Sequence, residues 1–242
     1  HMMQGPRFNW YRSINNDPRD WQNTVINLKS FQYALSADKR SVEVTTVLEA
    51  HVGNTVVPHT VIYTVHAGGA VDVNADFHAS EDFRLPRLAL QTMFSPSLEN
   101  VEWYGRGPIE NYRDRNAASF VGLYKSTVSD MREYYVRAQS MGGRTDTRWL
   151  SLTDDSGKGV RITADGTFDF SALHYTDPDL WRIKYGHDID LVRRAEVVLN
   201  LDCIQRGIGN ASCGPQPLPE YEIKSGTDYS YTFRIESAGG IQ

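Results

Sequence analysis

The polar residues best suited to chemistry gather in one short stretch, residues 103–115. This stretch holds three arginines, two carboxylates, an amide and three aromatic rings around a Gly-x-Gly-Pro turn. Planar polar groups bond sugar hydroxyls, and aromatic rings cover the apolar face of a sugar. The stretch is therefore a candidate sugar site, and the alternative is an arginine–carboxylate network that pins a long loop to the edge of the fold. The candidate binding residues are Arg106, Glu110, Asn111, Asp114 and Arg115.

Two further stretches carry candidate residues. Residues 139–149 place arginines and an aspartate ahead of a predicted strand, where a ligand site competes with a hairpin that carries a cross-strand Arg–Asp pair. Residues 207–215 form a glycine-rich loop after another predicted strand, where close approach to a ligand competes with a plain surface connection. This loop lacks the Gly-Lys-Ser/Thr of a phosphate loop. Its candidate binding residues are Asn210, Ser212 and Cys213.

The sequence gives little support for other kinds of chemistry. Cys213 has no activating base nearby in the sequence, so no catalytic thiol is predicted. The seven histidines follow no metal-ligand spacing, and two cysteines cannot build a disulfide framework or a four-ligand zinc site. Lys plus Arg is 25 and Asp plus Glu is 30, a net charge of −5, so neither nucleic acid nor a membrane surface is an expected partner. No apolar run approaches the ~20 residues of a membrane span.

The elements that must position these residues are strands. Apolar and polar residues alternate with a period of two along most of the chain, and turn sequences separate the runs, which favours a large antiparallel β-sandwich. Strands are predicted at residues 42–49, 57–65, 71–79, 87–94, 101–104, 149–153, 159–164, 168–173, 195–204, 220–224 and 229–235. Helix is predicted only at residues 23–33 and, for one or two turns, at residues 176–180.

Residues 103–115, which read Trp-Tyr-Gly-Arg-Gly-Pro-Ile-Glu-Asn-Tyr-Arg-Asp-Arg, resemble the signature of the C-terminal "small chain" domain of glycoside hydrolase family 2 β-galactosidases. Further segments resemble this domain in the same order, so the resemblance extends over nearly the whole chain. These segments are residues 12–17, 85–88, 135–149, 168–173 and 198–209.

The resemblance implies an all-β, galactose-mutarotase-like supersandwich. In the family this domain follows a catalytic barrel that holds both catalytic glutamates, so the chain is expected to contain no catalytic residue and to be inactive by itself. The magnesium and sodium that such enzymes often use lie in other domains, so no cofactor is expected here. We expect residues 1–2 to be a tag remnant and residues 3–242 to be one N-terminally truncated domain of a longer enzyme. A sheet edge left unpaired in this way would favour self-association.

In the family the loop that corresponds to residues 207–215 reaches back to the barrel, and in some members a tryptophan after the serine lines the sugar site. Here Cys213 follows Ser212, so weaker or different sugar contacts are expected. The expected partners are β-galactoside sugars and the barrel of the parent chain. One alternative is an autonomous carbohydrate-binding module without catalysis. Another is a mutarotase, which the fold alone suggests and for which no acid–base pair can be assigned.

Overall fold

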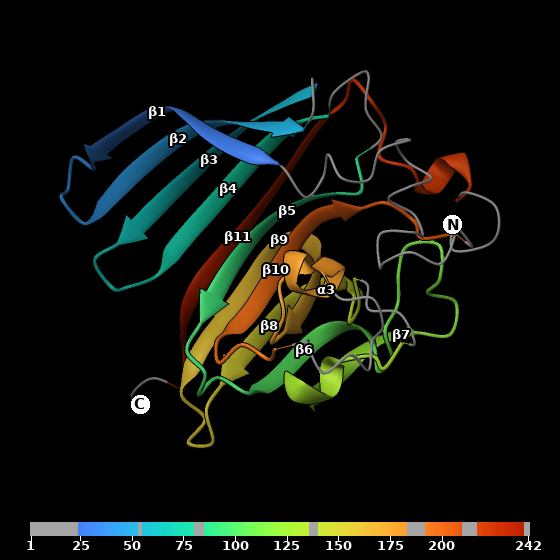
Figure 1. The fold of residues 1–242 in the computed structure, drawn as a ribbon. Coiled ribbons are helices and arrows are strands. Elements are labelled where there is room, and N and C mark those ends of the chain that lie inside the picture. Colours follow the sequence, from blue (N-terminus) through green and yellow to red (C-terminus); the bar gives the residue numbers. More distant parts are fainter. Residues whose placement is uncertain are drawn as a thin grey trace.

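Strands make up most of the regular structure in the computed structural model, which describes residues 24–52, 55–79, 85–135, 140–182, 192–209 and 217–239 (Figure 1). The strands are β1 (Val25–Leu35), β2 (Ser41–Val52), β3 (Thr55–His66), β4 (Val71–His78), β5 (Arg87–Phe94), β6 (Asn100–Gly107), β7 (Phe120–Thr127), β8 (Arg144–Thr153), β9 (Gly159–Leu173), β10 (Val197–Gln205) and β11 (Asp228–Ala238). The short helices are η2 (Ser129–Met131), α3 (Asp177–Arg182) and η3 (Pro219–Tyr221). In this described part of the chain, no helix has the length and apolar character needed to cross a membrane.

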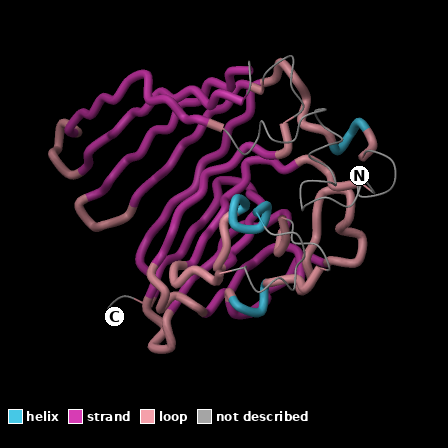
Figure 2. The backbone as a smooth tube through the Cα atoms, viewed as in Figure 1, coloured by secondary structure: helices cyan, strands magenta, loops and turns pink. Residues whose placement is uncertain are grey.

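The strands form a continuous antiparallel sheet that folds over on itself as a β-sandwich (Figure 2). Its main order is β1-β2-β3-β4-β11-β9-β8-β6-β7, and β10 and β5 branch from β9. The branch arises because β9 changes neighbours: residues 159–165 pair with β11, and residues 169–173 pair with β10. Gly166 lies at the change with a φ of 97°, a conformation that favours glycine. The predicted all-β sandwich is confirmed.

Alternation along single strands builds the core. On β4, Val73, Ala75 and Phe77 are buried, whereas Asn74 and Asp76 are exposed. The apolar face of the predicted strand at residues 71–79 is therefore the core face, as a period of two requires for a half-buried strand.

Contacts across the sandwich join the branch to the main sheet. The Tyr231 hydroxyl of β11 donates a hydrogen bond of 2.9 Å to the Leu201 carbonyl of β10. Within the main sheet, the Trp103 ring of β6 meets the Phe170 ring of β9 edge-on, with 5.9 Å between ring centroids. These contacts belong to one hydrophobic cluster, so the described residues of both layers share a single core.

The predicted helix at residues 23–33 is wrong, because residues 25–33 belong to β1. A bulge between Leu28 and Ser30 inserts Lys29 into the ladder with β2. Leu28 and Phe31 consequently lie three residues apart on the same face of the strand. Such a spacing is also typical of one face of a helix, and this explains the error.

Two other strand predictions need correction. The predicted strand at residues 220–224 is wrong, because this segment begins inside η3 and continues without strand pairing. Pro219 opens η3, and proline fixes the φ angle that this turn requires. The two strands predicted at residues 159–164 and 168–173 are one strand, β9, and β7 is a strand that the sequence analysis does not predict.

The predicted helical turn near residue 177 is confirmed as α3. The Thr176 hydroxyl accepts a hydrogen bond from the Asp179 backbone N–H at 3.3 Å, and the Asp179 carboxylate accepts one from the Thr176 backbone N–H at 2.9 Å. This reciprocal pair satisfies N–H groups that a helix start leaves unbonded.

Candidate functional site

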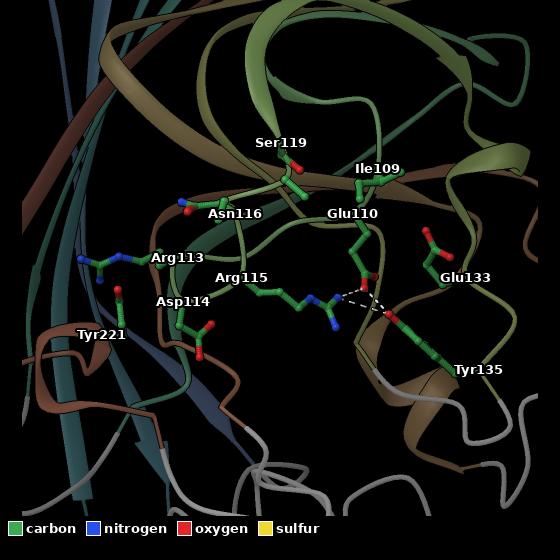
Figure 3. A pocket seen from close by; sticks show the side chains of 12 residues that line it. Ile109, Glu110, Arg113, Asp114, Arg115, Asn116, Ser119, Glu133, Tyr135 and Tyr221 are labelled. Carbon is green, nitrogen blue, oxygen red and sulfur yellow. Dashed lines mark hydrogen bonds and ion pairs between the residues drawn. The ribbon is translucent and has the colours of Figure 1, made fainter.

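The polar turn predicted as a sugar site connects β6 to β7 and lines a cavity of about 600 Å³ (Figure 3). Glu110, Asp114 and Arg115 line this cavity, together with two residues that are distant in sequence, Tyr135 and Tyr221. The sequence pattern points to neither tyrosine, because a local pattern does not show which distant segments fold back against a turn.

Glu110 lies at the centre of a buried hydrogen-bond cluster in this cavity. One carboxylate oxygen accepts hydrogen bonds from the Arg115 guanidinium, at 2.5 Å, and from the Tyr135 hydroxyl. The other oxygen accepts the Gly142 backbone N–H at 2.7 Å. In Figure 3 the Arg115 and Tyr135 side chains reach the Glu110 carboxylate from opposite sides. Glu110 is buried and bonded at both oxygens, so it ties the turn to the segment ahead of β8.

The surroundings keep the phenols of this cluster protonated. Burial, with a further contribution from the Glu110 carboxylate, raises the pKa of Tyr135 to about 12. The same two causes raise the pKa of Tyr112 well above its ordinary value. Arg115 lies over the Tyr112 ring, with its guanidinium carbon 5.2 Å from the ring centroid. The side chain of Arg115 is half exposed, so it is the cationic group that this cluster presents to the cavity.

Asn111 and Arg106 do not line this cavity. The Asn111 side chain is fully buried and accepts hydrogen bonds from the Thr145 backbone N–H, at 3.0 Å, and from the Thr145 hydroxyl, at 2.6 Å. Arg106 forms an ion pair with Asp146 and donates to the Ser119 carbonyl at 2.8 Å. Arg106 on β6 and Asp146 on β8 therefore link two neighbouring strands. This pair differs from the one expected within a hairpin at residues 139–149, because its arginine lies in the first stretch.

Asp114 connects the polar turn to the glycine-rich loop. One carboxylate oxygen accepts the Ile208 backbone N–H at 3.0 Å, and the other accepts the Gly209 backbone N–H at 2.6 Å. A Cβ atom added to Gly207 would lie 2.9 Å from the Asp114 carboxyl carbon and 2.7 Å from the Tyr221 Cβ, so only glycine fits this approach. Two of the three predicted stretches therefore meet at Asp114.

A second cavity of about 390 Å³ lies beside Arg113, whose side chain points away from the Arg115–Glu110 cluster in Figure 3. Asp169 lines this second cavity and accepts the Asp146 backbone N–H at 3.0 Å. Across the β9–β10 ladder Asp169 faces Asp202, which is held by Arg87 at 2.6 Å. Burial, with the nearby charge of Asp202 adding to it, raises the pKa of Asp169 to about 7. The folded chain therefore carries a proton on Asp169 at mildly acidic pH.

Three predicted binding residues, Asn210, Ser212 and Cys213, lie outside the described residues, as do residues 12–17 of the resemblance. The structure brings Glu110, Asp114 and Arg115 to one cavity and uses Arg106 and Asn111 to hold the turn that carries them. Sugar binding by any of these residues stays a prediction. The arrangement offers half-buried carboxylate and guanidinium groups together with phenol rings, which is the chemistry that polyhydroxylated ligands require.

Comparison with known proteins shows the family. The model of a family described as "Beta galactosidase small chain" matches residues 1–235. The chain belongs to the beta-galactosidase small-chain family.

The chain is also similar to curated proteins named beta-galactosidase, which supports a glycosidase family context. The relative from Vibrio cholerae is 32% identical over 180 residues, which are 73% of this chain and 17% of that protein. The relative from Staphylococcus xylosus is 31% identical over 169 residues, which are 69% of this chain and 16% of that protein. The small-chain domain thus spans less than a fifth of these relatives. Among solved structures, the alpha-galactosidase AgaA from Geobacillus stearothermophilus is similar over 88% of this chain and 28% of its own chain, with 9% identity and a TM-score of 0.47.

Proposed function

We propose that residues 3–242 form the C-terminal domain of a longer family 2 β-galactosidase, in which the intact retaining enzyme hydrolyses terminal β-D-galactosides. In this proposal the domain supports a catalytic barrel elsewhere in the parent chain and contributes the glycine-rich loop to the sugar site. Membership of the small-chain family supports it, together with the small share of each relative that the chain spans.

One observation carries the proposed role of the loop. Asp114 fixes two consecutive backbone N–H groups, those of Ile208 and Gly209, at the point where the loop leaves β10. Hydrogen bonds from N–H groups to an ionised acceptor are among the stronger ones in proteins. The polar turn thereby holds residues 208 and 209 in place at the base of the loop. A loop that completes a sugar site in another domain needs this kind of rigid base.

The hydrogen bonds that Glu110 and Asp114 accept support the proposal that the isolated chain does not hydrolyse galactosides. A retaining glycosidase needs two carboxyl groups about 5–5.5 Å apart, one free to attack the sugar and one to exchange a proton. Both oxygens of Glu110 and both oxygens of Asp114 accept hydrogen bonds from the chain itself. These two carboxylates are therefore occupied in structural roles. Among the described residues, Glu133 is the remaining carboxylate that lines this cavity, and one carboxylate does not supply the required pair.

The experiment is hydrolysis of p-nitrophenyl β-D-galactoside by the purified chain, followed alongside Glu110→Gln. We expect no release of nitrophenol above the buffer rate from either protein. Turnover that co-purifies with the chain and disappears in Glu110→Gln would contradict the proposal, because it would place the acid–base chemistry in this domain.

An autonomous carbohydrate-binding module is the second candidate, because the cavity presents Arg115 and Asp114 beside two tyrosines. Saturation-transfer NMR with galactose and then lactose separates the two functions. Transfer to the sugar that is lost in Arg115→Ala, with an unchanged circular dichroism spectrum, would favour the module. Absence of transfer would leave the domain as a support and loop carrier for the barrel.

A further inference from the structure

The inner face of the long sheet continues past the core to the edge strand and stays mainly apolar, with Thr46 and His59 as polar members. The ladders place Tyr33 of β1 beside Val44 of β2, Tyr63 of β3, Val73 of β4 and Phe233 of β11, one after another. All five therefore stand on one face of the sheet, which at β4 and β11 is the core face. The row is buried at its β11 end and opens at its β1 end, because Val73 and Phe233 are each 2% exposed whereas Tyr33 is 75% exposed.

A neighbouring row of this face shows the same gradient. Phe31 lies in a row with Val61, Ala75 and Tyr231; Phe31 is 56% exposed and the other three are buried. The bulge at Lys29 keeps this face apolar, because it returns the side chains before and after it to the same side. We call the uncovered part the open apolar face. Its exposed members on β1 are Ile26, Leu28, Phe31, Tyr33 and Leu35.

Figure 1 shows why the face is open. Strands β1 and β2 extend beyond β5 and β10, the strands that form the covering layer over the core. No described element of the chain lies over β1, and its eleven residues are almost all exposed. A sheet face this apolar is normally packed against another layer, and exposed patches of this size mark interaction sites.

The charges of these two strands all lie away from the open apolar face. Glu43 and Glu49 of β2 pair in register with Ala34 and Asn27 on the opposite face of β1, and Lys29 is held by Glu49 at 3.3 Å. The members of the open apolar face on β2 are Val42, Val44, Thr46, Leu48 and Ala50, none of them charged. Two copies of this face can therefore meet without opposing any like charges.

We propose that the open apolar face is a dimer interface and that its occupant is the same face of a second copy of this chain, related by a two-fold axis. A two-fold interface needs a self-complementary patch, and an uncharged apolar sheet face has this property. The exposed parts of the five β1 side chains contribute roughly 500 Å² per copy, since aromatic side chains alone bury about 150–250 Å² each. The pair buries roughly 1,000 Å² before β2 adds to it, which reaches the lower limit of about 1,000 Å² for a specific interface.

Sedimentation velocity of the purified chain over a range of micromolar concentrations tests this proposal. Phe31→Asp places a charge on the open apolar face, and Gln32→Asp places the same charge on the opposite face of the same strand. We expect a concentration-dependent dimer whose Kd rises about 30-fold or more in Phe31→Asp and less than threefold in Gln32→Asp, because burying a charge in an apolar contact opposes association.

Tyr33→Lys is a second variant at the most exposed position of the face and should weaken the dimer as Phe31→Asp does. Thermal unfolding followed by circular dichroism checks that each variant is folded. A wild-type chain that is monomeric at every concentration tested would overturn the proposal. If that monomer also binds a hydrophobic dye that Phe31→Asp no longer binds, the face has another occupant, such as a further segment of a longer enzyme. A dimer that Gln32→Asp weakens as much as Phe31→Asp does would also overturn it, because it would point to pairing along the β1 edge.

Discussion

Asp114→Asn is the sharpest perturbation of the contact between the polar turn and the glycine-rich loop. The wild-type carboxylate accepts the Ile208 N–H at 3.0 Å and the Gly209 N–H at 2.6 Å, one at each oxygen. Asparagine retains one carbonyl oxygen and replaces the second acceptor with an NH₂ group. That NH₂ group would point at a backbone N–H, so one bond is lost and two donors face each other.

The magnitude follows from this geometry. A hydrogen bond to a charged group contributes about 1.5–3 kcal/mol, and half-burial of Asp114 favours the lower end of this range. A local loss of about 1.5–2 kcal/mol corresponds to roughly 10- to 30-fold faster opening of the loop base, since each 1.4 kcal/mol is a factor of ten. The change is local, because the ladders that hold β10 do not involve Asp114.

Hydrogen exchange of single backbone amides, followed by NMR, measures this effect directly. We expect the Ile208 or the Gly209 amide to exchange at least about 10-fold faster in Asp114→Asn, while amides in the centre of β10 keep their rates. Asp165→Asn makes the same change of charge at an exposed position on β9 and is the matched control. Equal exchange at Ile208 and Gly209 in the wild type and in Asp114→Asn would refute the role assigned to Asp114.

The remaining predictions concern stability. Glu110→Gln should lower the free energy of unfolding by about 2–4 kcal/mol in urea titrations, because it removes a buried charge that accepts three hydrogen bonds. Arg115→Ala, at a half-exposed partner, should lower the free energy of unfolding by about 1 kcal/mol or less. Equal losses in the two variants would contradict a cluster held by Glu110. Asp169 has its pKa raised to about 7 in the folded chain, against about 4 when unfolded, so the folded state binds more protons between these values and loses stability as pH rises through them. The wild type should therefore lose up to about 3 kcal/mol in its free energy of unfolding between pH 5 and pH 8, and Asp169→Asn should remove this loss. A loss that persists in Asp169→Asn but changes in Asp165→Asn would show that the burial argument is wrong.

The alternation of apolar and polar residues predicted most of the fold because it reports directly which face of a strand is buried. It worked best on β4, where every second residue enters the core. It failed at β1, where the bulge at Lys29 shifts the period by one residue, and at residues 220–224, where Tyr221 and Ile223 alternate with charged residues without a strand neighbour. In that second segment Glu222 pairs with the buried Arg206 guanidinium, a contact that a local pattern does not contain.

The chemical character of the candidate site was predictable from the sequence. Which of its residues hold the turn and which face the cavity was not. Composition alone could identify residues 103–115 as a polar cluster, but it offered a sugar site and a pinning network as alternatives for the whole stretch. The contacts that decide between them span 25 residues for Glu110–Tyr135 and 95 residues for Asp114–Gly209. Only the folded chain shows that the Asn111 side chain is buried in hydrogen bonds within the chain, whereas Arg115 faces the cavity.

The division of roles within the turn agrees with the supporting role that we propose for this chain. Buried and fully bonded groups such as Glu110 hold the turn in place. Asp114 of the same turn then holds Ile208 and Gly209 at the base of the loop. At the far end of the same sheet, the open apolar face leaves β1 without a described covering layer. If the loop anchored at one end and the uncovered sheet at the other both contact protein, as we propose, the interactions of this chain should depend on packing partners as much as on any small ligand.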